Sequence, residues 1–337
     1  MLIKSPGKSI IRSAIPRRIK WGVSGCGHFV ETSVLPALAL IQRSKLVSVF
    51  SHDLQRAKQV AGKFGAQNFS DNFSDFIKGD FDLLYIAGAN VDHYRQAVEA
   101  AQAGKHIICE KPVGINSSQI EEIIKVCKTY GVVFTVNFTH RFHPLVLKAK
   151  ELVNKGMIGK IVSVSASFNI DFAPSDNFRF KKDLSGGGAL RDLGSHMIDM
   201  IRLFGGEISG VKGYTDNIVY KSEVEDFASA ILKFEKGGYG YFNVSYNAKK
   251  SFNRIEILGH KGVISIENFI GKKNVSGKLI IDLQGEAKKA FRKRANKISY
   301  MIKSVQKSLI KNQPPLVPGE DALAAMKIME EIEKQCP

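Results

Sequence analysis

Residues 19–27 read Ile-Lys-Trp-Gly-Val-Ser-Gly-Cys-Gly, a short apolar run that breaks at two glycines. A helical pattern follows, with one apolar side formed by Phe29, Val30, Val34, Leu35, Leu38 and Ile41. A strand, a glycine turn and a helix in this order predict a backbone that a pyrophosphate can approach closely. The motif is incomplete, because Val30 stands where G-x-G-x-x-G has its third glycine.

The same alternation of strand and helix continues to residue 136. We expect strands at 46–50, 81–87, 106–109 and 132–136, and helices at 54–64, 91–103 and 117–130. Apolar strands that alternate with helices predict a parallel sheet covered on both faces. Ligands of such sheets bind at the carboxyl ends of the strands. The residues that fall at these ends are Gly25, Ser51, Gly88, Ala89, Asn90 and Lys111.

Three side chains suited to proton transfer occur in two separate motifs. Glu110-Lys111-Pro112 follows the strand at 106–109 and places an ammonium group at its mouth. Asp192 and His196 stand four residues apart in a predicted helix, so both face the same way. An amine, an imidazole and a carboxylate that converge can handle a proton. The alternative is a solvated loop lysine and an ordinary ion pair on a helix surface.

These motifs resemble those of the glucose-fructose oxidoreductase and inositol dehydrogenase (Gfo/Idh/MocA) family. The matching stretches are residues 22–27, 103–106, 110–112, 137–144 and 186–192, and the likeness continues through His196 and Asp199. The resemblance implies an α/β fold: an N-terminal Rossmann dinucleotide-binding domain, then an α+β domain with a large open, mostly antiparallel sheet. It also implies an enzyme that oxidises or reduces a carbinol carbon in sugars, cyclitols and related compounds.

The resemblance also implies a role for each of the three side chains. Lys111 would contact the substrate hydroxyl and the nicotinamide ribose, next to a Lys111–Pro112 bond that is often cis. His196 would be the general acid or base, and Asp192 would orient or polarise the site. The chemistry agrees, since a carbinol that loses a hydride must also lose its hydroxyl proton. An imidazole accepts that proton well, and a nearby ammonium stabilises the alkoxide.

The end of the second strand bears on cofactor choice. NAD-binding domains usually have an Asp or Glu there for the ribose 2′-hydroxyl, but this strand ends Phe50-Ser51-His52. Asp53 comes later and can cap the next helix, whereas Arg56 can reach a 2′-phosphate. Ser51 with Arg56 resembles the pattern of NADP-dependent family members, so we favour NADP(H) over NAD(H).

Other cofactor contacts are implied by position in the family. Asn90 and His93 fit a Pro-Asn-x-x-His loop in which Ala89 replaces the proline, and Asn137 and Arg179 stand where related reductases contact the cofactor. The complete predicted cofactor set is Gly25, Cys26, Gly27, His28, Phe29, Ser51, His52, Arg56, Gly88, Asn90, His93, Glu110, Lys111, Asn137 and Arg179.

Basic residues are concentrated in two stretches of the chain. The formal net charge is +17 and the isoelectric point about 9.6, values that invite a nucleic-acid hypothesis. Residues 1–20 hold six Lys or Arg and no acid, and residues 286–311 hold nine against one Glu. The remainder of the chain is nearly balanced, so we expect no nucleic-acid partner.

The second basic stretch contains an amphipathic helical pattern, formed by Ile298, Met301, Ile302, Val305 and Leu309. Such a helix can lie on an anionic membrane surface or dock its apolar side on the protein. We favour docking, with the apolar side on the substrate domain. The preceding Arg292-Lys293-Arg294 is predicted to belong to a solvated basic insert at about 286–297.

At 337 residues the chain is long enough for two domains. We expect a basic, flexible leader at 1–16, a Rossmann domain at 17–139 and a substrate-binding and oligomerisation domain at 140–337. The leader has no apolar run long enough for a signal peptide or a membrane span, although it weakly resembles an organelle transit segment. In the last domain, strands are expected at 161–168, 227–234, 239–246 and 254–258, with a hairpin at Gly237-Gly238.

The remaining predictions concern metals, location and assembly. Cys26, Cys109, Cys127 and Cys336 lack disulfide or metal spacing, which indicates reduced thiols in a cytoplasmic protein. His140 and His143 have no third ligand nearby in sequence, so we expect no metal and place them in a pocket or on the surface. An open sheet leaves a face to cover, so we expect a homodimer or homotetramer. A non-catalytic dinucleotide-sensing regulator or scaffold with the same fold is the alternative function.

Overall fold

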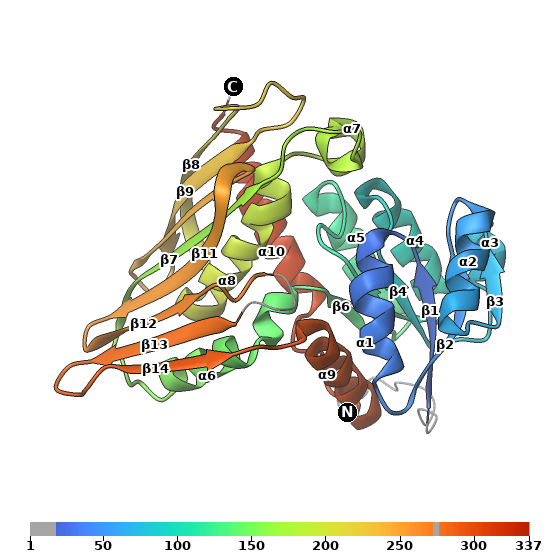
Figure 1. Ribbon diagram of the computed structural model, residues 1–337, viewed down its shortest axis with the longest axis horizontal. Coiled ribbons are helices and arrows are strands. Elements are labelled where there is room, and N and C mark those ends of the chain that lie inside the picture. Colours follow the sequence, from blue (N-terminus) through green and yellow to red (C-terminus); the bar gives the residue numbers. More distant parts are fainter. Residues whose placement is uncertain (1–17, 272–275, 337) are drawn as a thin grey trace, which may run out of the picture.

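The computed structural model describes residues 18–271 and 276–336. Two β-sheets lie next to each other, with helices between and around them (Figure 1). The predicted leader at 1–16 falls outside the described residues and stays a prediction. The mixed α/β class expected from the sequence is confirmed.

The first sheet has six parallel strands in the order β3-β2-β1-β4-β5-β6. They are β1 (Ile19–Ser24), β2 (Ser44–Phe50), β3 (Asn68–Ser70), β4 (Leu83–Ile86), β5 (His106–Cys109) and β6 (Phe134–Val136). The helices that connect them are α1 (Leu35–Ala39), α2 (Leu54–Phe64), α3 (Phe73–Phe76), α4 (Asn90–Gln102) and α5 (Ser117–Thr129), with a π-turn, η1 (Val30–Val34), before α1. The strand order reverses at β1 and β4, where such sheets bind ligands.

Local signals explain why these helices begin and end near the predicted residues. The Asp53 carboxylate accepts a hydrogen bond from the Arg56 N–H, so it caps α2 as the sequence suggested. Gly65 ends the same helix in the left-handed conformation, with φ of 72°. Asn116 caps α5 in the same way through the Gln119 N–H.

The second sheet has eight strands in the order β14-β13-β12-β11-β7-β10-β9-β8. They are β7 (Ile161–Asp171), β8 (Ile208–Asp216), β9 (Phe227–Phe234), β10 (Tyr239–Ser245), β11 (Asn247–Gly259), β12 (Gly262–Glu267), β13 (Gly277–Leu283) and β14 (Lys289–Lys293). Every neighbouring pair is antiparallel except β7 and β10. Gly237 and Gly238 have φ of 84° and 93° and turn the predicted hairpin between β9 and β10.

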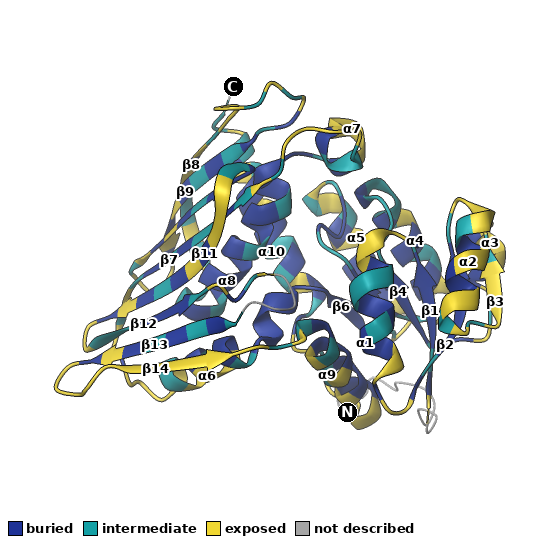
Figure 2. Ribbon diagram, in the orientation of Figure 1, coloured by how far each residue is buried: buried dark blue, intermediate teal, exposed yellow. Residues whose placement is uncertain are grey.

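Helices cover one face of this sheet, and the other face is open. The helical segments are η2 (Thr139–Phe142), α6 (Pro144–Asn154), η3 (Phe178–Phe180), α7 (Lys182–Ser185), a π-turn η4 (Leu190–Gly194), α8 (Ser195–Gly205), α9 (Lys297–Lys311) and α10 (Gly319–Glu333). Along β10 the side chains alternate, with Phe242 and Val244 buried and Tyr239 and Tyr241 exposed. Figure 2 shows the buried residues gathered along the two sheets and the helices between them.

The structure adds detail to two predictions about the basic stretch. Arg292, Lys293 and Arg294 are exposed, as predicted, and the first two belong to the edge strand β14. The predicted amphipathic helix exists as α9, which contacts η2 at the start of the predicted substrate domain and also α1 of the first sheet. The Gln306 amide donates to Ser44 Oγ at 2.6 Å at the start of β2. The C-terminal segment therefore returns to the Rossmann sheet.

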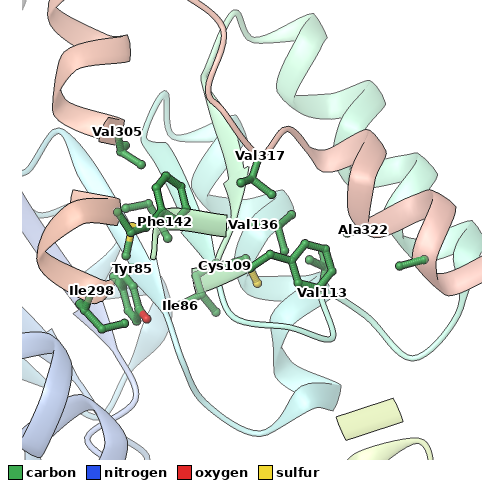
Figure 3. Packing of buried hydrophobic residues seen from close by; sticks show 14 of the residues in the cluster. Tyr85, Ile86, Cys109, Val113, Val136, Phe142, Ile298, Val305, Val317 and Ala322 are labelled. Atoms are coloured by element: carbon green, nitrogen blue, oxygen red, sulfur yellow. The ribbon is translucent and has the colours of Figure 1, made fainter. Parts of the chain in front are cut away.

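The C-terminal segment and the first sheet share one apolar core where α9 and Val317 meet that sheet. In Figure 3, Ile298 and Val305 of α9 and Val317 lie near Ile86, Cys109 and Val136 of the first sheet. The Val136 N–H donates to the Val317 carbonyl at 3.0 Å, so the C-terminal segment is also tied to the edge of β6. Packing of this kind fixes the cleft between the halves.

Candidate active site

The glycine turn after β1 is held close to the neighbouring strand. Gly25 has φ of 99°, and its N–H donates to the Phe50 carbonyl at 2.9 Å. A Cβ atom at Gly25 would lie 2.6 Å from the Ala87 carbonyl, so only glycine fits there. A Cβ at Gly27 would meet nothing within 4 Å. The space beside Gly27 is therefore open, at the start of the helical segment where Gly-x-Gly turns approach a pyrophosphate.

A cavity of about 730 Å³ opens between the two halves. The predicted site residues that line it are Gly27, His28, Phe29, Gly88, Asn90, His93, Glu110, Lys111, Asn137, Arg179, Asp192 and His196. Gly25, Cys26, Ser51, His52 and Arg56 do not line it: the first four lie in the turns that follow β1 and β2, and Arg56 lies in the first turn of α2. Side chains that are more than 80 residues apart in sequence thus share one space.

The ammonium of Lys111 is the centre of the polar contacts in the cavity. Its Nζ donates to Asp192 Oδ1 at 2.5 Å and to the Asp192 carbonyl at 2.7 Å. The Tyr246 hydroxyl donates to Asp192 Oδ2 at 3.0 Å, and Arg179 Nε lies 3.5 Å from the same oxygen. Burial raises the pKa of Asp192, but Lys111 and Arg179 outweigh it and hold that pKa below its usual range. Asp192 is therefore a carboxylate at neutral pH.

His196 lies one turn beyond Asp192, at the start of α8. Asp192 itself belongs to the π-turn η4, and π-turns within helices are frequent at functional sites. Burial and the charges of Lys111 and Lys297 hold the pKa of His196 well below its usual range, although Asp192 opposes them. Its Nδ1 atom is buried and has no hydrogen-bond partner among the described residues. The imidazole is neutral at pH 7.

Glu110 lines the cavity and also belongs to a buried cluster of polar side chains. The Tyr85 hydroxyl and the Asn137 amide both donate to its carboxylate, and Asn137 also donates to the Tyr85 oxygen at 2.8 Å. Burial raises the pKa of Glu110 despite these bonds. The cluster fixes the segment that carries Lys111, whose peptide bond to Pro112 is cis.

Asn90 and His93 line the cavity while bonding to the protein. The Asn90 amide donates to the Ser185 carbonyl at 2.9 Å, which connects α4 to α7. His93 contacts the Pro112 carbonyl through Nδ1 at 2.8 Å and the Gly88 carbonyl through Nε2 at 3.2 Å. Both side chains therefore shape the loops on which the cavity is built.

Residues beyond the glycine turn form a charged cluster at the end of β2. Arg56 Nε donates to the Cys26 carbonyl at 3.0 Å, and its guanidinium also bonds to Glu31. Lys63 donates to the other oxygen of Glu31 at 2.6 Å. His52 Nε2 lies 3.0 Å from Asp92. The two cations around one carboxylate leave a positive environment beside the turn.

Sequence reasoning missed Tyr246 and Lys297. Tyr246 ends the β10 region and bonds to Asp192, and no motif marked it. Lys297 was assigned to a solvated insert, yet it lines the cavity and donates to His140 Nδ1 at 3.1 Å. His140, predicted for a pocket or the surface, stacks edge-on against His196 with ring centres 4.3 Å apart. For Lys297, the sequence offered one signal of a special position, namely a lysine at the start of an amphipathic helix.

The described residues contain neither a metal-binding cluster nor a helix suited to cross a membrane. No group of three or more His, Cys, Asp or Glu side chains in 18–271 and 276–336 is arranged to hold a metal ion. In the same ranges, none of the helices has the length and apolar character that crossing a membrane requires. All four cysteines are free thiols.

The parallel sheet and the glycine turn, beside one cavity lined by Lys111, Asp192 and His196, are the features of a dinucleotide-binding oxidoreductase. Two family models match the chain: "Oxidoreductase family, NAD-binding Rossmann fold" over residues 19–138, and "GFO/IDH/MocA C-terminal domain" over residues 146–265. The chain belongs to the Gfo/Idh/MocA family, as the motifs predicted.

Curated relatives include several sugar and diol dehydrogenases. An oxidoreductase of Formosa agariphila is 28% identical over 274 residues, which cover 79% of this chain and 84% of that protein. Levoglucosan dehydrogenase of Pseudarthrobacter phenanthrenivorans is 32% identical over 229 residues, covering 65% of this chain and 58% of that protein. These and other relatives carry the names of oxidoreductases, dehydrogenases and reductases, and the chain is an oxidoreductase.

Solved structures agree in fold. An aldose-aldose oxidoreductase from Caulobacter crescentus, complexed with glycerol, superposes with a TM-score of 0.88 at 24% identity, over 95% of this chain and 97% of that one. A 3-ketoreductase from Actinomadura kijaniata, solved with NADP, gives 0.83 at 24% identity over 95% and 98%. Levoglucosan dehydrogenase, solved with NADH, gives 0.85 at 22% identity over 94% and 96%. Both cofactors therefore occur among similar folds.

Proposed function

We propose that the protein transfers a hydride between NADP(H) and a carbinol or carbonyl carbon of a sugar, cyclitol or sugar derivative. One observation carries the proposal: Lys111 and Asp192, in contact at 2.5 Å, and His196 face the same cavity that opens on the glycine turn. A buried amine, carboxylate and imidazole that line one cavity are typical of a catalytic site and serve no purpose in a scaffold without turnover. No observation favours the regulator.

The side chains of the chain handle the proton. When bound, the nicotinamide supplies or accepts the hydride. A neutral His196 can take the hydroxyl proton during oxidation and return it during reduction. Because Nδ1 is buried, we assign this transfer to Nε2. Lys111 stabilises the negative charge that develops on the substrate oxygen, and Asp192 holds the ammonium in place.

NADP(H) is favoured by the charged cluster at the end of β2. A 2′-phosphate there would meet Arg56 and Lys63, with Glu31 as the one carboxylate between them. No carboxylate ends β2 to accept the ribose 2′-hydroxyl of NAD, because Ser51 follows Phe50 directly and Asp53 caps α2.

The experiment combines cofactor titration with turnover. We expect NADPH to bind more tightly than NADH when each is titrated by fluorescence. With a panel of sugars and cyclitols, His196→Asn and Lys111→Met should each lower kcat by at least about 100-fold. Both variants should bind NADPH within about threefold of the wild type, since they alter a proton transfer and not the dinucleotide site.

A surface lysine provides the control for Lys111. Lys303→Met removes a charge from the exposed side of α9 and should leave kcat unchanged. Wild-type turnover by Lys111→Met or His196→Asn would refute the assigned roles. Failure to bind either dinucleotide would refute the function as a whole.

We also propose that the protein is a homodimer or homotetramer. The open face of the second sheet exposes Tyr214, Ile231, Tyr239, Tyr241 and Leu258. Pairing across the sheet sets Tyr241 beside Ile231, so apolar side chains adjoin one another there. The molecular mass from light scattering distinguishes the two assemblies from a monomer.

A further inference from the structure

Lys297 has an environment unlike that of an ordinary surface lysine. It is the first residue of α9 and only partly exposed, and its ammonium points to the cavity wall formed by His140 and Phe269. Nζ donates to His140 Nδ1 at 3.1 Å and to the Phe269 carbonyl at 3.1 Å. An ammonium has three donors, so one remains for a group inside the cavity.

Among the described residues, no carboxylate pairs with this ammonium. Within 18–271 and 276–336, Lys297 forms no ion pair, and the remaining residues of the chain include no Asp or Glu. The other cations of the cavity differ, because Lys111 and Arg179 share the carboxylate of Asp192. A charge removed from water without a counter-ion is costly unless a ligand completes it.

The N-terminus of α9 adds positive potential to the part of the cavity beside Lys297. Ala295, Asn296 and Ile298 line the cavity with it, so the N-terminus of a 15-residue helix opens on the same space. His140 is 6% exposed, and its Nε2 has no hydrogen-bond partner in the described part of the chain. Burial lowers the pKa of Lys297 to about 8, which leaves it mostly protonated at pH 7.

The position of this charge relates it to the reacting centre. Lys297 contacts His140, and His140 stacks on His196 with ring centres 4.3 Å apart. Lys297 is therefore separated from the proposed acid and base by a single imidazole. Both side chains line one cavity, so a substrate whose hydroxyl reaches His196 has room to extend toward Lys297.

We propose that Lys297 binds an oxyanion substituent of the substrate, so that the enzyme prefers sugars or cyclitols bearing a carboxylate or a phosphate away from the reacting carbon. The inference rests on the proposed function and names its substrate class. A purely structural role, in which Lys297 ties Phe269 to η2, accounts for two of its donors but not for the missing counter-ion.

The test compares matched neutral and anionic probes on the NADPH-saturated protein. D-glucose, D-glucuronate and D-glucose 6-phosphate are titrated by calorimetry into the wild type, Lys297→Met and the control Lys303→Met. We expect at least one anion to bind the wild type about tenfold or more tightly than glucose. That advantage should fall below about threefold in Lys297→Met, which keeps the length of the side chain, and persist in Lys303→Met.

The two anionic arms identify the source of the oxyanion, since preference for glucuronate indicates a carboxylate and preference for glucose 6-phosphate indicates a phosphate. The proposal is overturned if neither anion binds better than glucose, or if Lys297→Met weakens all three probes equally. Unchanged NADPH binding and turnover of neutral sugars in that case would leave the proposed function standing. Loss of NADPH binding in the wild type would instead refute the function.

Discussion

Gly25 and Gly27 lie in the same turn, but the structure gives a different reason for glycine at each position. Gly25 is required by the protein itself, since its φ of 99° and the Ala87 backbone exclude a side chain. Gly27 is not required by packing, because a Cβ there meets nothing. We propose that Gly27 instead leaves room for the pyrophosphate of the dinucleotide. Substitutions at Gly25 are therefore expected to affect folding, and substitutions at Gly27 to affect binding.

This difference gives a prediction at the scale of single residues. Gly25→Ala should lower the free energy of unfolding by about 2 kcal/mol or more, from backbone strain and the clash with Ala87. Gly27→Ala should fold with nearly wild-type stability but bind NADPH at least about tenfold more weakly, since its methyl group enters the pyrophosphate space. Urea unfolding and NADPH titration measure the two effects. Equal stability loss in both variants would contradict the argument.

At the scale of elements, a buried ion-pair network holds the helix that carries His196. Arg141 of η2 donates to both oxygens of Asp199 on α8, at 3.0 and 2.5 Å, and to Asp321 on α10 at 2.8 Å. Arg202 of α8 also contacts Asp321 at 3.1 Å. Burial raises the pKa of Asp199 to about 6 even though Arg141 lowers it. Three elements thus depend on one set of paired charges.

Removing one partner should therefore cost more than an ordinary hydrogen bond. Asp199→Ala leaves Arg141 with one carboxylate in a buried site, and we expect a loss of about 3 kcal/mol in unfolding free energy. The exposed pair of Lys78 and Asp75 provides a control, and Asp75→Ala should cost less than about 1 kcal/mol. Urea unfolding of both variants measures the difference. Similar costs would show that the network is not important for stability.

At the scale of the whole molecule, buried histidines make stability depend on pH. Burial is the main cause that lowers the pKa values of His93, His106, His140, His143 and His196, the value for His143 to about 4. His140, His143 and His196, whose pKa values are lowered the most, are neutral in the folded protein and titrate near pH 6.5 when it unfolds. The unfolded chain therefore binds more protons below pH 6.5, and stability falls as pH falls.

We expect a loss of about 1 kcal/mol in unfolding free energy for each of His140, His143 and His196 at pH 5.5 relative to pH 7.5. Asp199, Glu110 and Glu225 oppose this trend, because burial raises their pKa values, so the net loss is smaller than the full sum. Urea unfolding at several pH values tests the prediction. His143→Asn, which keeps a side chain able to cap α6, should flatten the slope by about one proton. A stability independent of pH between 7.5 and 5.5 would contradict it.

The sequence by itself determined the elements whose signals are local. The strand and glycine turn at 19–27, the helix at 54–64 with its Asp53 cap, and the hairpin at Gly237-Gly238 all appear as predicted. Periodicity and capping act over a few residues, so one chain is enough to recognise them. The motifs around Lys111 and His196 were likewise recognisable, and the structure places both side chains on one cavity.

Only the tertiary structure decided what depends on contacts between distant segments. It brought Tyr246 to Asp192, and it placed α9 against the Rossmann sheet in addition to η2. It also moved Lys297 from an expected solvated insert to the cavity wall, beside His140, which is 157 residues away in sequence. Burial and the absence of a counter-ion are properties of the assembled core. No short stretch of sequence records them, because the partners that create them are far apart in the chain.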